Sequence, residues 1–258
     1  MIEGVFGHFI AHFLDHVSRE QLWKIRLLLC KFIAPREEMR VSFSALLRSA
    51  EGDSYLLVRS LHRKEAFGPF GGVYKYHDPA RSQLDDLEFR PQSGTAVDDM
   101  KNDLRGFLPR RRVLALTRWF DHAIGREHAG ICLHRELIEE LKEVRLATRH
   151  PVPKLIQFKH IRRVREGPVR AAGQTYTQYR IFDIYDVAEP DEEVSQFLRD
   201  LRSAAATHKD LMLATAREIV AGRSADGRMI GHHAGYLFGR KRTRPDEPMF
   251  VEPSRPFK

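Results

Sequence analysis

The spacing of apolar residues changes along the chain and predicts helices near both ends with strands between them. Residues 1–34 have helical spacing and predict two helices, the second beginning at the capping residue Ser18 and ending before Pro35. From residue 39 the period shortens to two, because apolar and small polar residues alternate over 41–45. This alternation is typical of a half-buried strand.

The middle of the chain is expected to supply much of a sheet. Turn-forming residues at 50–54 predict that strands over 41–45 and 55–59 form a hairpin. The sequence FGPFGGVYKY, residues 67–76, predicts a turn rich in proline and glycine that leads into a short extended segment. A further strand is expected over 84–90.

The second half is expected to contain helices over 113–120 and 129–143. Two longer strands are expected over 154–164 and 176–187, joined by a turn around 166–168.

Helices are then expected over 190–205 and 209–221. The resulting order of helices, strands, a helix, strands and helices predicts an α+β fold, with a mixed or antiparallel sheet covered by helices.

Composition narrows the class of protein. The chain has 258 residues, of which 42% are hydrophobic and 30% charged, as in globular proteins with a sizeable core. Two cysteines, Cys30 and Cys132, suit a reducing cytoplasm and exclude a disulfide framework. No transmembrane segment is expected, because no uncharged run approaches the roughly 20 apolar residues that a membrane-spanning helix needs.

The balance of charge favours anionic partners. A formal net charge of +8 is compatible with nucleotides or nucleic acid as ligands. The basic run RKRTR at 240–244 raises the hypothesis of nucleic-acid binding or RNA-end processing. No RNA-binding aromatic motif supports that hypothesis, so nucleic acid is the weaker expectation.

The helix expected over 129–143 carries an excess of glutamate. Glu136, Glu139, Glu140 and Glu143 fall at i, i+3, i+4 and i+7 and therefore share one face of the helix. A solvated helix surface would explain scattered glutamates. A crowded acidic face also suits Mg²⁺ or Mn²⁺, which prefer hard oxygen ligands and can activate water for attack on phosphorus.

The spacing of Glu127 and Arg135 before these glutamates is not explained by a solvated helix. Together the residues resemble the Nudix box, G-x5-E-x7-R-E-U-x-E-E-x-G-U, where U is a bulky aliphatic residue. Two glycine positions depart from that pattern, since Asp121 stands at the first and Lys142 at the last; Glu143 stands at the final aliphatic position. The positions that fit are Glu127, Arg135, Glu136, Leu137, Glu139 and Glu140.

The glycine half of the box is expected upstream, at GPFGG (68–72), which looks like the Pro-Gly-Gly turn that usually precedes it. The segment at 100–111 and the late segment at 218–238 resemble the SMODS-associated Nudix domains of bacterial antiphage (CD-NTase/CBASS-type) systems. The resemblance implies a Nudix-like α/β/α sandwich with a mixed sheet. The expected parts are an N-terminal helical extension over 1–37, the Nudix domain over 38–238 with an insert at 77–120, and a basic, proline-rich tail over 239–258.

The resemblance also implies roles for individual residues. The candidate catalytic residues are Glu136, Glu139, Glu140 and Arg135, and the candidate ligands of Mg²⁺ or Mn²⁺ are Glu136, Glu140, Glu139 and Glu127. The general base is left open among Asp186, Glu189, Glu192 and Glu193. The candidate substrate-binding residues are Gly71, Gly72, Arg59, Lys101 and Arg105, although any single arginine or lysine is more often an ordinary surface charge.

The expected function is therefore a cytoplasmic, metal-dependent hydrolase in bacterial antiphage defence. It would cleave a phosphoanhydride in a nucleoside diphosphate-linked or other nucleotide-derived substrate. The alternative is a Nudix-fold module that senses a nucleotide with little or no turnover. A protein of the same CD-NTase system and a second copy of the chain are the expected protein partners, with the apolar helices of 1–34 as a candidate contact surface.

Overall fold

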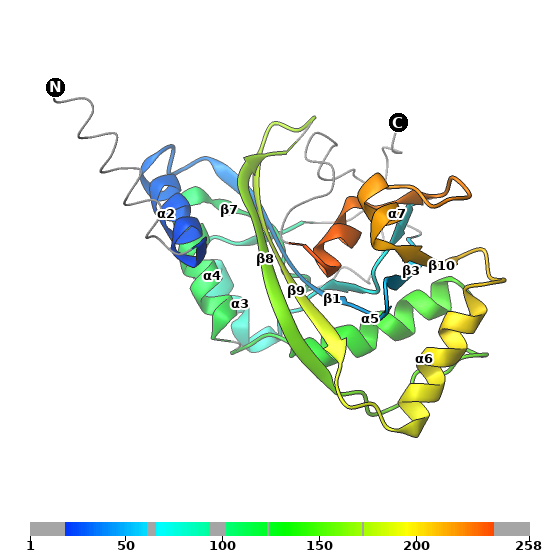
Figure 1. Cartoon of the computed structure of the whole chain (residues 1–258). Coiled ribbons are helices and arrows are strands. Elements are labelled where there is room, and N and C mark those ends of the chain that lie inside the picture. The colour runs from blue at the N-terminus through cyan, green and yellow to red at the C-terminus, as the bar shows by residue number, and fades with distance from the viewer. Residues whose placement is uncertain (1–18, 61–65, 93–101, 123, 172, 240–258) are drawn as a thin grey trace.

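The computed structural model describes residues 19–60, 66–92, 102–122, 124–171 and 173–239 (Figure 1). The first of the two helices expected in 1–34, most of the polar loop before residue 102 and the tail from residue 240 lie outside the described residues. The described part is an α+β structure with two sheets and helices packed around them, as the element order predicts.

The larger sheet has six described strands and supports the acidic helix. Strand β1 lies at its centre, parallel to β9 on one edge and antiparallel to β7 and β5 on the other. The long antiparallel pair of β8 and β9 curves through the middle of Figure 1. The order is β6 (Arg90–Pro91), β7 (Arg105–Pro109), β1 (Glu38–Leu47), β9 (Thr177–Val187) and β8 (Phe158–Arg170), with β5 (Gly71–Val73) also on β1.

The smaller sheet has five described strands. Strand β3 is central in it and pairs antiparallel with β10, β4 and β2, whereas β11 runs parallel to β4. The strands are β10 (Leu211–Thr215), β3 (Ser54–Arg59), β4 (Ala66–Gly68), β11 (Met229–Ile230) and β2 (Ala50–Glu51).

The alternation along β1 assigns its two faces. Val41, Phe43 and Ala45 lie in the main hydrophobic core, together with leucines of the acidic helix and residues of the helices nearer the N-terminus. A second apolar cluster lies on the other faces of the two sheets. The helical elements are α2 (Arg19–Phe32), η1 (Asp78–Ala80), α3 (Arg81–Asp86), η3 (Arg110–Arg112), α4 (Val113–Asp121), α5 (Ala129–Glu143), α6 (Glu192–Ala204), α7 (Ala216–Ala221) and η4 (His232–Leu237).

Elements with strong local periodicity were predicted well. Helix α5 has the expected bounds, and the second N-terminal helix, α4 and α6 are confirmed within one or two residues at most ends. The two long strands are also confirmed, but the turn expected at 166–168 is wrong. Strand β8 continues through that point with an irregularity in its register, and the chain turns between Arg170 and Thr177 instead.

Three local predictions were wrong, two of them because strand pairing overrode local pattern. The strands expected as a hairpin belong to different sheets, since β3 pairs with the short β2 and not with β1. The strand expected over 84–90 is instead the end of helix α3 (to Asp86) followed by a turn, and only its last residue, Arg90, is in a strand. Strand β10 occupies most of the first half of the helix expected over 209–221 and pairs with residues 54–58 of β3. Helix α7 then begins at a capping box formed by Thr215 and Glu218.

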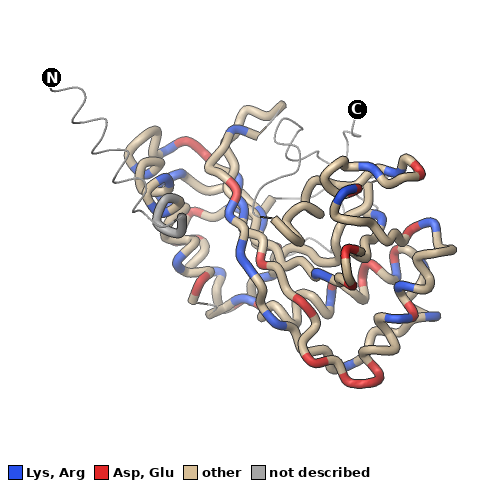
Figure 2. The backbone as a smooth tube through the Cα atoms, viewed as in Figure 1, with Lys and Arg blue, Asp and Glu red and all other residues tan. Residues whose placement is uncertain are grey.

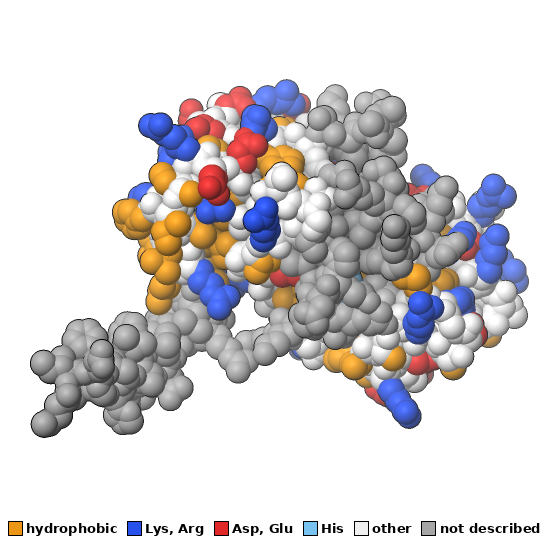
Figure 3. Space-filling view, turned by 90° about the horizontal axis from the view of Figure 1, so that it is seen from above, with side chains coloured by type: hydrophobic (Ala, Val, Ile, Leu, Met, Phe, Trp, Pro, Cys, Tyr) orange, Lys and Arg blue, Asp and Glu red, His pale blue; other side chains and the backbone are white. Residues whose placement is uncertain are grey.

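The segments expected as an extension and an insert are integral to the described core. Strand β7 of segment 77–120 pairs with five residues of β1. Trp23 and Leu27 of α2 are buried in the main core. The outward side of α2 mixes exposed apolar side chains with the exposed charges of Lys24, Arg26 and Lys31. Leu29, Phe32 and the following Ile33 are 52%, 74% and 63% exposed, and hydrophobic side chains gather at the left of Figure 3 where α2 lies. None of the described helices combines the length and apolarity that crossing a membrane would require.

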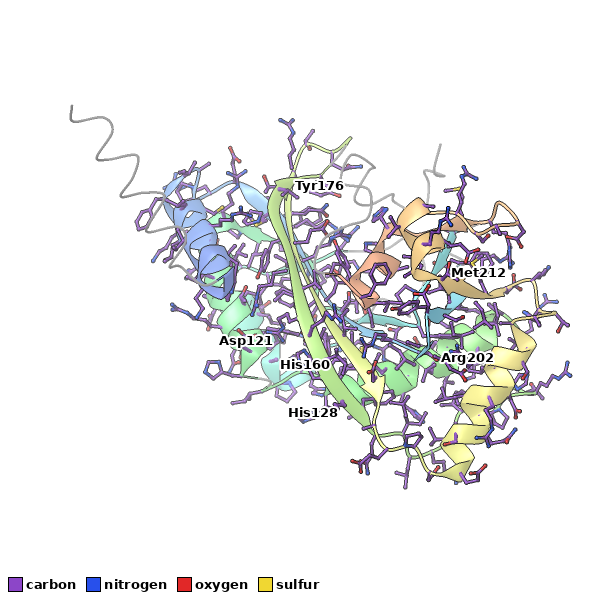
Figure 4. All side chains as sticks on the ribbon, viewed as in Figure 1. Asp121, His128, His160, Tyr176, Arg202 and Met212 are labelled. Carbon is purple, nitrogen blue, oxygen red and sulfur yellow. The ribbon has the colours of Figure 1, made fainter. Side chains whose placement is uncertain are left out.

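A buried ionic network connects β8, β9 and α4. Asp183, only 1% exposed, accepts hydrogen bonds from Nε and Nη2 of Arg163 at 2.5 and 2.9 Å and from the Tyr74 hydroxyl at 3.3 Å. Arg163 also pairs with Asp121, which Figure 4 labels at the end of α4. Burial alone would raise the pKa of Asp183, but the hydrogen bonds from Arg163 and His160 outweigh it and hold that pKa below its usual value.

Substitution of Asp183 tests this network. Asp183→Asn is expected to lower the free energy of unfolding at neutral pH by about 3 kcal/mol, because it leaves the Arg163 guanidinium undercompensated. The contribution of a carboxylate with a lowered folded-state pKa is present above its unfolded pKa and is lost as the pH falls through the folded one. The difference between wild type and variant, measured by urea unfolding, should therefore shrink below about pH 4.

The matched control is Asp186→Asn on the same strand, where the carboxylate is 29% exposed and bound to Arg48. It should cost about 1 kcal/mol or less. Equal losses in the two variants would contradict a special role for the Asp183 network.

Candidate functional site

Helix α5 separates its apolar and acidic residues by helical spacing. Its buried stripe consists of Cys132, Leu133, Leu137 and Leu141, which face the main core. The Glu136 and Glu139 side chains, on the adjacent surface, are 16% and 43% exposed. The helix ends at Glu143 with Val144 as its cap, so the missing final glycine does not extend it by another turn.

The glycine loop lies directly against this acidic surface. The Gly71 N–H donates a hydrogen bond to the Glu140 carboxylate at 3.0 Å. A Cβ atom at Gly72 would lie 2.1 Å from the carboxyl carbon of Glu136. The two halves of the motif, separated by more than 60 positions in the sequence, are therefore in contact in the structure.

Arg135 binds three of the glutamates and the backbone of β5. Its Nη1 donates to Glu136 at 2.6 Å and to Glu139 at 3.1 Å. Its Nη2 donates to Glu127 at 2.6 Å and to the Val73 carbonyl at 3.0 Å. The guanidinium thereby restrains the rotamers of the glutamates and ties α5 to the strand that carries the glycines.

Glu127 is held in a buried position before α5. Its side chain is 5% exposed and pairs with Arg135, and its backbone N–H donates to the Lys75 carbonyl at 2.9 Å. These contacts anchor the entry of α5 to the extended segment that follows the glycines. In this structure Glu127 therefore acts as an ion-pair partner of Arg135.

The negative charges of Glu136 and Glu140 are not fully balanced by neighbouring positive charges. Burial raises the pKa of Glu136 to about 7, although Arg135 opposes the shift. Burial, and next the charge of Glu136, raise the pKa of Glu140 well above its ordinary value. Two neighbouring carboxylates that resist ionisation without a further positive charge fit the site of a hard divalent cation.

Glu136 and Glu140 suit a divalent cation that keeps part of its water shell, because the site offers few free carboxylates. Within the described ranges, no three His, Cys, Asp or Glu side chains converge to hold a metal ion. Arg135 already binds Glu127, Glu136 and Glu139. Mg²⁺ is commonly bound through about one or two carboxylates with waters and substrate oxygens completing its shell, and Glu136 and Glu140 could supply those carboxylates.

Asp103 is a site residue that the sequence did not indicate. It is 6% exposed, and burial raises its pKa to about 6; its charge in turn contributes to the raised pKa of Glu136. Arg105, a predicted substrate-binding residue, donates to Asp103 at 3.1 Å and so lies beside the acidic cluster. An isolated β-bridge between Lys75 and Asp103 positions this carboxylate near the acidic cluster. Such a bridge joins distant segments, so no local sequence pattern predicts it.

Other candidates lie elsewhere. Arg59 is in the smaller sheet and pairs with Asp210 at 2.5 Å, and within the described part of the chain no ion pair or hydrogen bond joins it to the glutamates of α5. Lys101 lies outside the described residues. Among the candidate bases, Asp186 is bound to Arg48 at 2.7 and 2.5 Å. The acidic residues at 189–193 are exposed and gather where β9 leads into α6, at the lower edge of Figure 2.

Comparisons with known proteins agree with the motif. The model of the SMODS-associated NUDIX domain matches residues 38–238. A search of curated proteins gave no match. Among solved structures, a crystal structure of Shewanella oneidensis NrtR complexed with a 27mer DNA aligns with 12% identity and a TM-score of 0.32. The alignment covers 77% of this chain and 57% of that one, and at this level of similarity nothing about ligands follows from it.

Proposed function

The chain belongs to the SMODS-associated NUDIX domain family, and we propose that it is a metal-dependent hydrolase that cleaves a phosphoanhydride bond in a nucleotide-derived substrate. A nucleoside diphosphate linked to another group is the leading substrate class. The observation that carries the proposal is the contact of the Gly71–Gly72 loop with Glu140 and Glu136. Without that contact, the acidic face would be an ordinary helix surface.

In this proposal Glu136 and Glu140 hold Mg²⁺ or Mn²⁺. A bound divalent cation neutralises phosphate charge and lowers the pKa of water, which suits attack on phosphorus. Hydrolysis joins a water oxygen to one phosphorus and breaks the bridging P–O bond, leaving a phosphate group on each product.

The other residues of the site act by positioning. The Gly71 N–H orients one oxygen of Glu140, and the absent side chain of Gly72 leaves the space that Glu136 occupies. Arg135 fixes Glu136 and Glu139, and Glu127 anchors Arg135 in turn. The 3.1 Å contact supports Glu139 as a partner of Arg135, although its 43% exposure also leaves it accessible to a second ion.

We place this activity beside a CD-NTase of a bacterial antiphage system, in the cytoplasm. The family description, SMODS-associated, supports that setting. The exposed apolar side of α2 supports a contact with a second copy or with another protein of the system.

The second candidate function is a nucleotide sensor with little turnover. The involvement of Arg135 with three glutamates favours it, because fewer carboxylates are then left to hold ions. The two functions share a ligand class and differ only in whether the bound nucleotide is cleaved.

A substrate panel distinguishes them. Purified protein is incubated with ADP-ribose, NAD, dinucleoside polyphosphates or nucleoside triphosphates, with Mg²⁺, Mn²⁺ or EDTA, and products are separated by chromatography. Cyclic oligonucleotides, which contain phosphodiesters, are added as binding probes. The hydrolase proposal expects metal-dependent cleavage of at least one phosphoanhydride. Stoichiometric binding with no cleavage across the panel would favour the sensor.

A further inference from the structure

A groove runs along the exposed side of α5, next to the face that carries the glutamates. Its volume is about 490 Å³, and its walls are α5 and the segment at 154–156 that leads into β8 (Figure 1). Small-molecule sites in proteins usually have volumes of roughly 300–1,000 Å³. The groove is therefore large enough to hold part of a nucleotide.

The groove and the acidic site share side chains. Arg135 and Glu139 line the groove, and Arg135 donates to Glu136 at 2.6 Å and to Glu139 at 3.1 Å. At 3.6 residues per turn, Arg135 and Glu139 are rotated from Glu136 by about 60–100° in the same direction around the helix axis. Glu139 is 43% exposed. A ligand bound at Glu136 can therefore extend past Glu139 into the groove.

The wall opposite α5 is packed against that helix. The Nε2 atom of His134 lies 2.9 Å from the Pro153 carbonyl oxygen, which can accept its proton in a hydrogen bond. Ile156 packs against the main core. At the start of α5, a Cβ atom at Gly130 would lie 3.7 Å from the Phe158 ring. The groove thus lies between two segments that hold each other in place.

Two lysines of the groove are unpaired. Lys142 on α5 and Lys154 on the opposite wall both line the groove, and both are exposed. Within the described ranges neither lysine forms an ion pair or a hydrogen bond. Glu139, the carboxylate that lines the same groove, is already paired with Arg135. The groove therefore presents two positive charges that no described carboxylate balances.

Much of the remaining lining of the groove is aliphatic. Ile131 on α5 and Leu155 on the opposite wall are 58% and 84% exposed, and Ile138 and Ile156 also line the groove. Aliphatic side chains exposed in one groove lose contact with water when an uncharged part of a ligand covers them, which favours binding. The groove suits a ligand that combines an uncharged body with a negatively charged group.

The charge of the two lysines indicates which negative group fits. A phosphate within a diester or a nucleic-acid backbone carries about one negative charge, whereas a phosphate monoester carries roughly −1.5 to −2 at pH 7. A lysine ammonium binds phosphate as a compact point charge. Two lysines therefore match the charge of a phosphate monoester better than that of a diester or of a neutral sugar.

We propose that the groove binds a phosphate monoester of the substrate, separate from the phosphoanhydride that is cleaved, and that Lys142 and Lys154 determine this specificity. The proposal rests on the proposed function in that the phosphoanhydride of the same molecule lies at Glu136 and Glu140. Lys142 follows Glu136 by six residues, or about 9 Å along the helix axis, so one nucleotide can reach both. The substrate class is thereby narrowed to nucleotides that carry both groups.

Two matched pairs of nucleotides test the proposal. NADP differs from NAD only by a 2′-phosphate, and coenzyme A differs from 3′-dephospho-coenzyme A only by a 3′-phosphate. Each pair shares one phosphoanhydride, so a bound metal ion contributes equally to both members. Affinities are measured by calorimetry with Mg²⁺, and the recovered ligand is checked for cleavage by chromatography. Where a ligand is cleaved, kcat/KM takes the place of the affinity.

Wild type is expected to prefer the member with the monoester by about tenfold or more in at least one pair, because hydrogen bonds between charged groups are strong. The preference should shrink as salt is added, since exposed charges are screened. Lys142→Gln and Lys154→Gln should each reduce the preference by about threefold or more, and the double variant should bring the two members within about twofold. Both side chains are exposed, so the melting temperature should not change.

The matched control is Lys209→Gln, which removes an exposed lysine before β10 that does not line the groove. It should keep the full preference. Loss of the preference in the double variant but not in this control supports the subsite even if no nucleotide of the substrate panel is cleaved.

Three results would overturn the proposal. The first is equal affinity within both pairs, or no measurable binding of any of the four ligands, which would leave metal-dependent cleavage of other nucleotides standing as a separate result. The second is a preference that survives in the double variant. The third is an equal loss of preference in Lys209→Gln, which would show that the phosphate is attracted by the basic surface as a whole.

Discussion

Replacing Glu136 or Glu140 by glutamine is expected to abolish Mg²⁺- or Mn²⁺-dependent cleavage of whichever nucleotide the wild-type protein hydrolyses. The loss should be about 100-fold or more, since even residues that only support a metal ligand typically cost about 10- to 100-fold. Both variants should stay folded, because each substitution removes a carboxylate whose raised pKa already marks it as undercompensated. Initial rates with titrated metal, together with thermal melts, measure both effects.

The matched control is Glu143→Gln, which changes an exposed glutamate at the end of the same helix. It should leave the rate within a few-fold of wild type. Undiminished turnover in both Glu136→Gln and Glu140→Gln would refute the metal-site assignment. A loss in Glu143→Gln as large as in the other two would show that general acidity of the helix, and not the two named carboxylates, supports activity.

Alanine substitutions in the glycine loop should separate stability from function. In Gly72→Ala, the new Cβ would lie 2.2 Å from both carboxylate oxygens of Glu136. The end of that flexible side chain can move away, so the protein should fold while its activity falls nearly as far as in Glu136→Gln. Metal-dependent cleavage and the melting temperature are the two measurements required.

Gly71→Ala should have a different effect. Its Cβ would lie 2.2 Å from the backbone oxygen of Ala45 in β1, and Gly71 has a φ of +130°. Neither the central strand nor this conformation accommodates a side chain, so the free energy of unfolding should fall by at least about 1–3 kcal/mol. Gly68→Ala is the control within the same segment, because its Cβ would meet nothing within 4 Å. Full activity in Gly72→Ala would contradict the role assigned to the loop.

The loop predictions depend on a contact that the motif alone does not specify. Pairing of β5 with β1 positions Gly71 and Gly72, and packing of α5 under β5 positions Glu136 and Glu140. The departures from the usual box spacing therefore change the length of chain between its two halves without separating them in space. This is the structural reason for preferring hydrolysis over a degenerate acidic helix.

The spacing of residues in the sequence was sufficient to predict those features that depend on residues a few positions apart. The bounds of α5 and the common face of its glutamates follow from helical periodicity, which involves residues three and four positions apart. The positions of Glu127 and Arg135 were likewise evident from spacing, and the structure joins them at 2.6 Å. The family and the α+β class follow from the same features.

Only the tertiary structure determined the strand pairing and the contacts between segments that are distant in the sequence. Strand pairing placed β1 and β3 in different sheets, converted the first part of the helix expected over 209–221 into β10, and separated Arg59 from the acidic cluster. The fold also brought Asp103 to the site and placed Lys154 on the same groove as Lys142. A strand acquires its partners and its buried face from remote parts of the chain, and its own side-chain alternation does not identify them. The sequence thus determined which residues are the candidates for phosphate chemistry, whereas only the fold determined which glycines, carboxylates and polar side chains surround them.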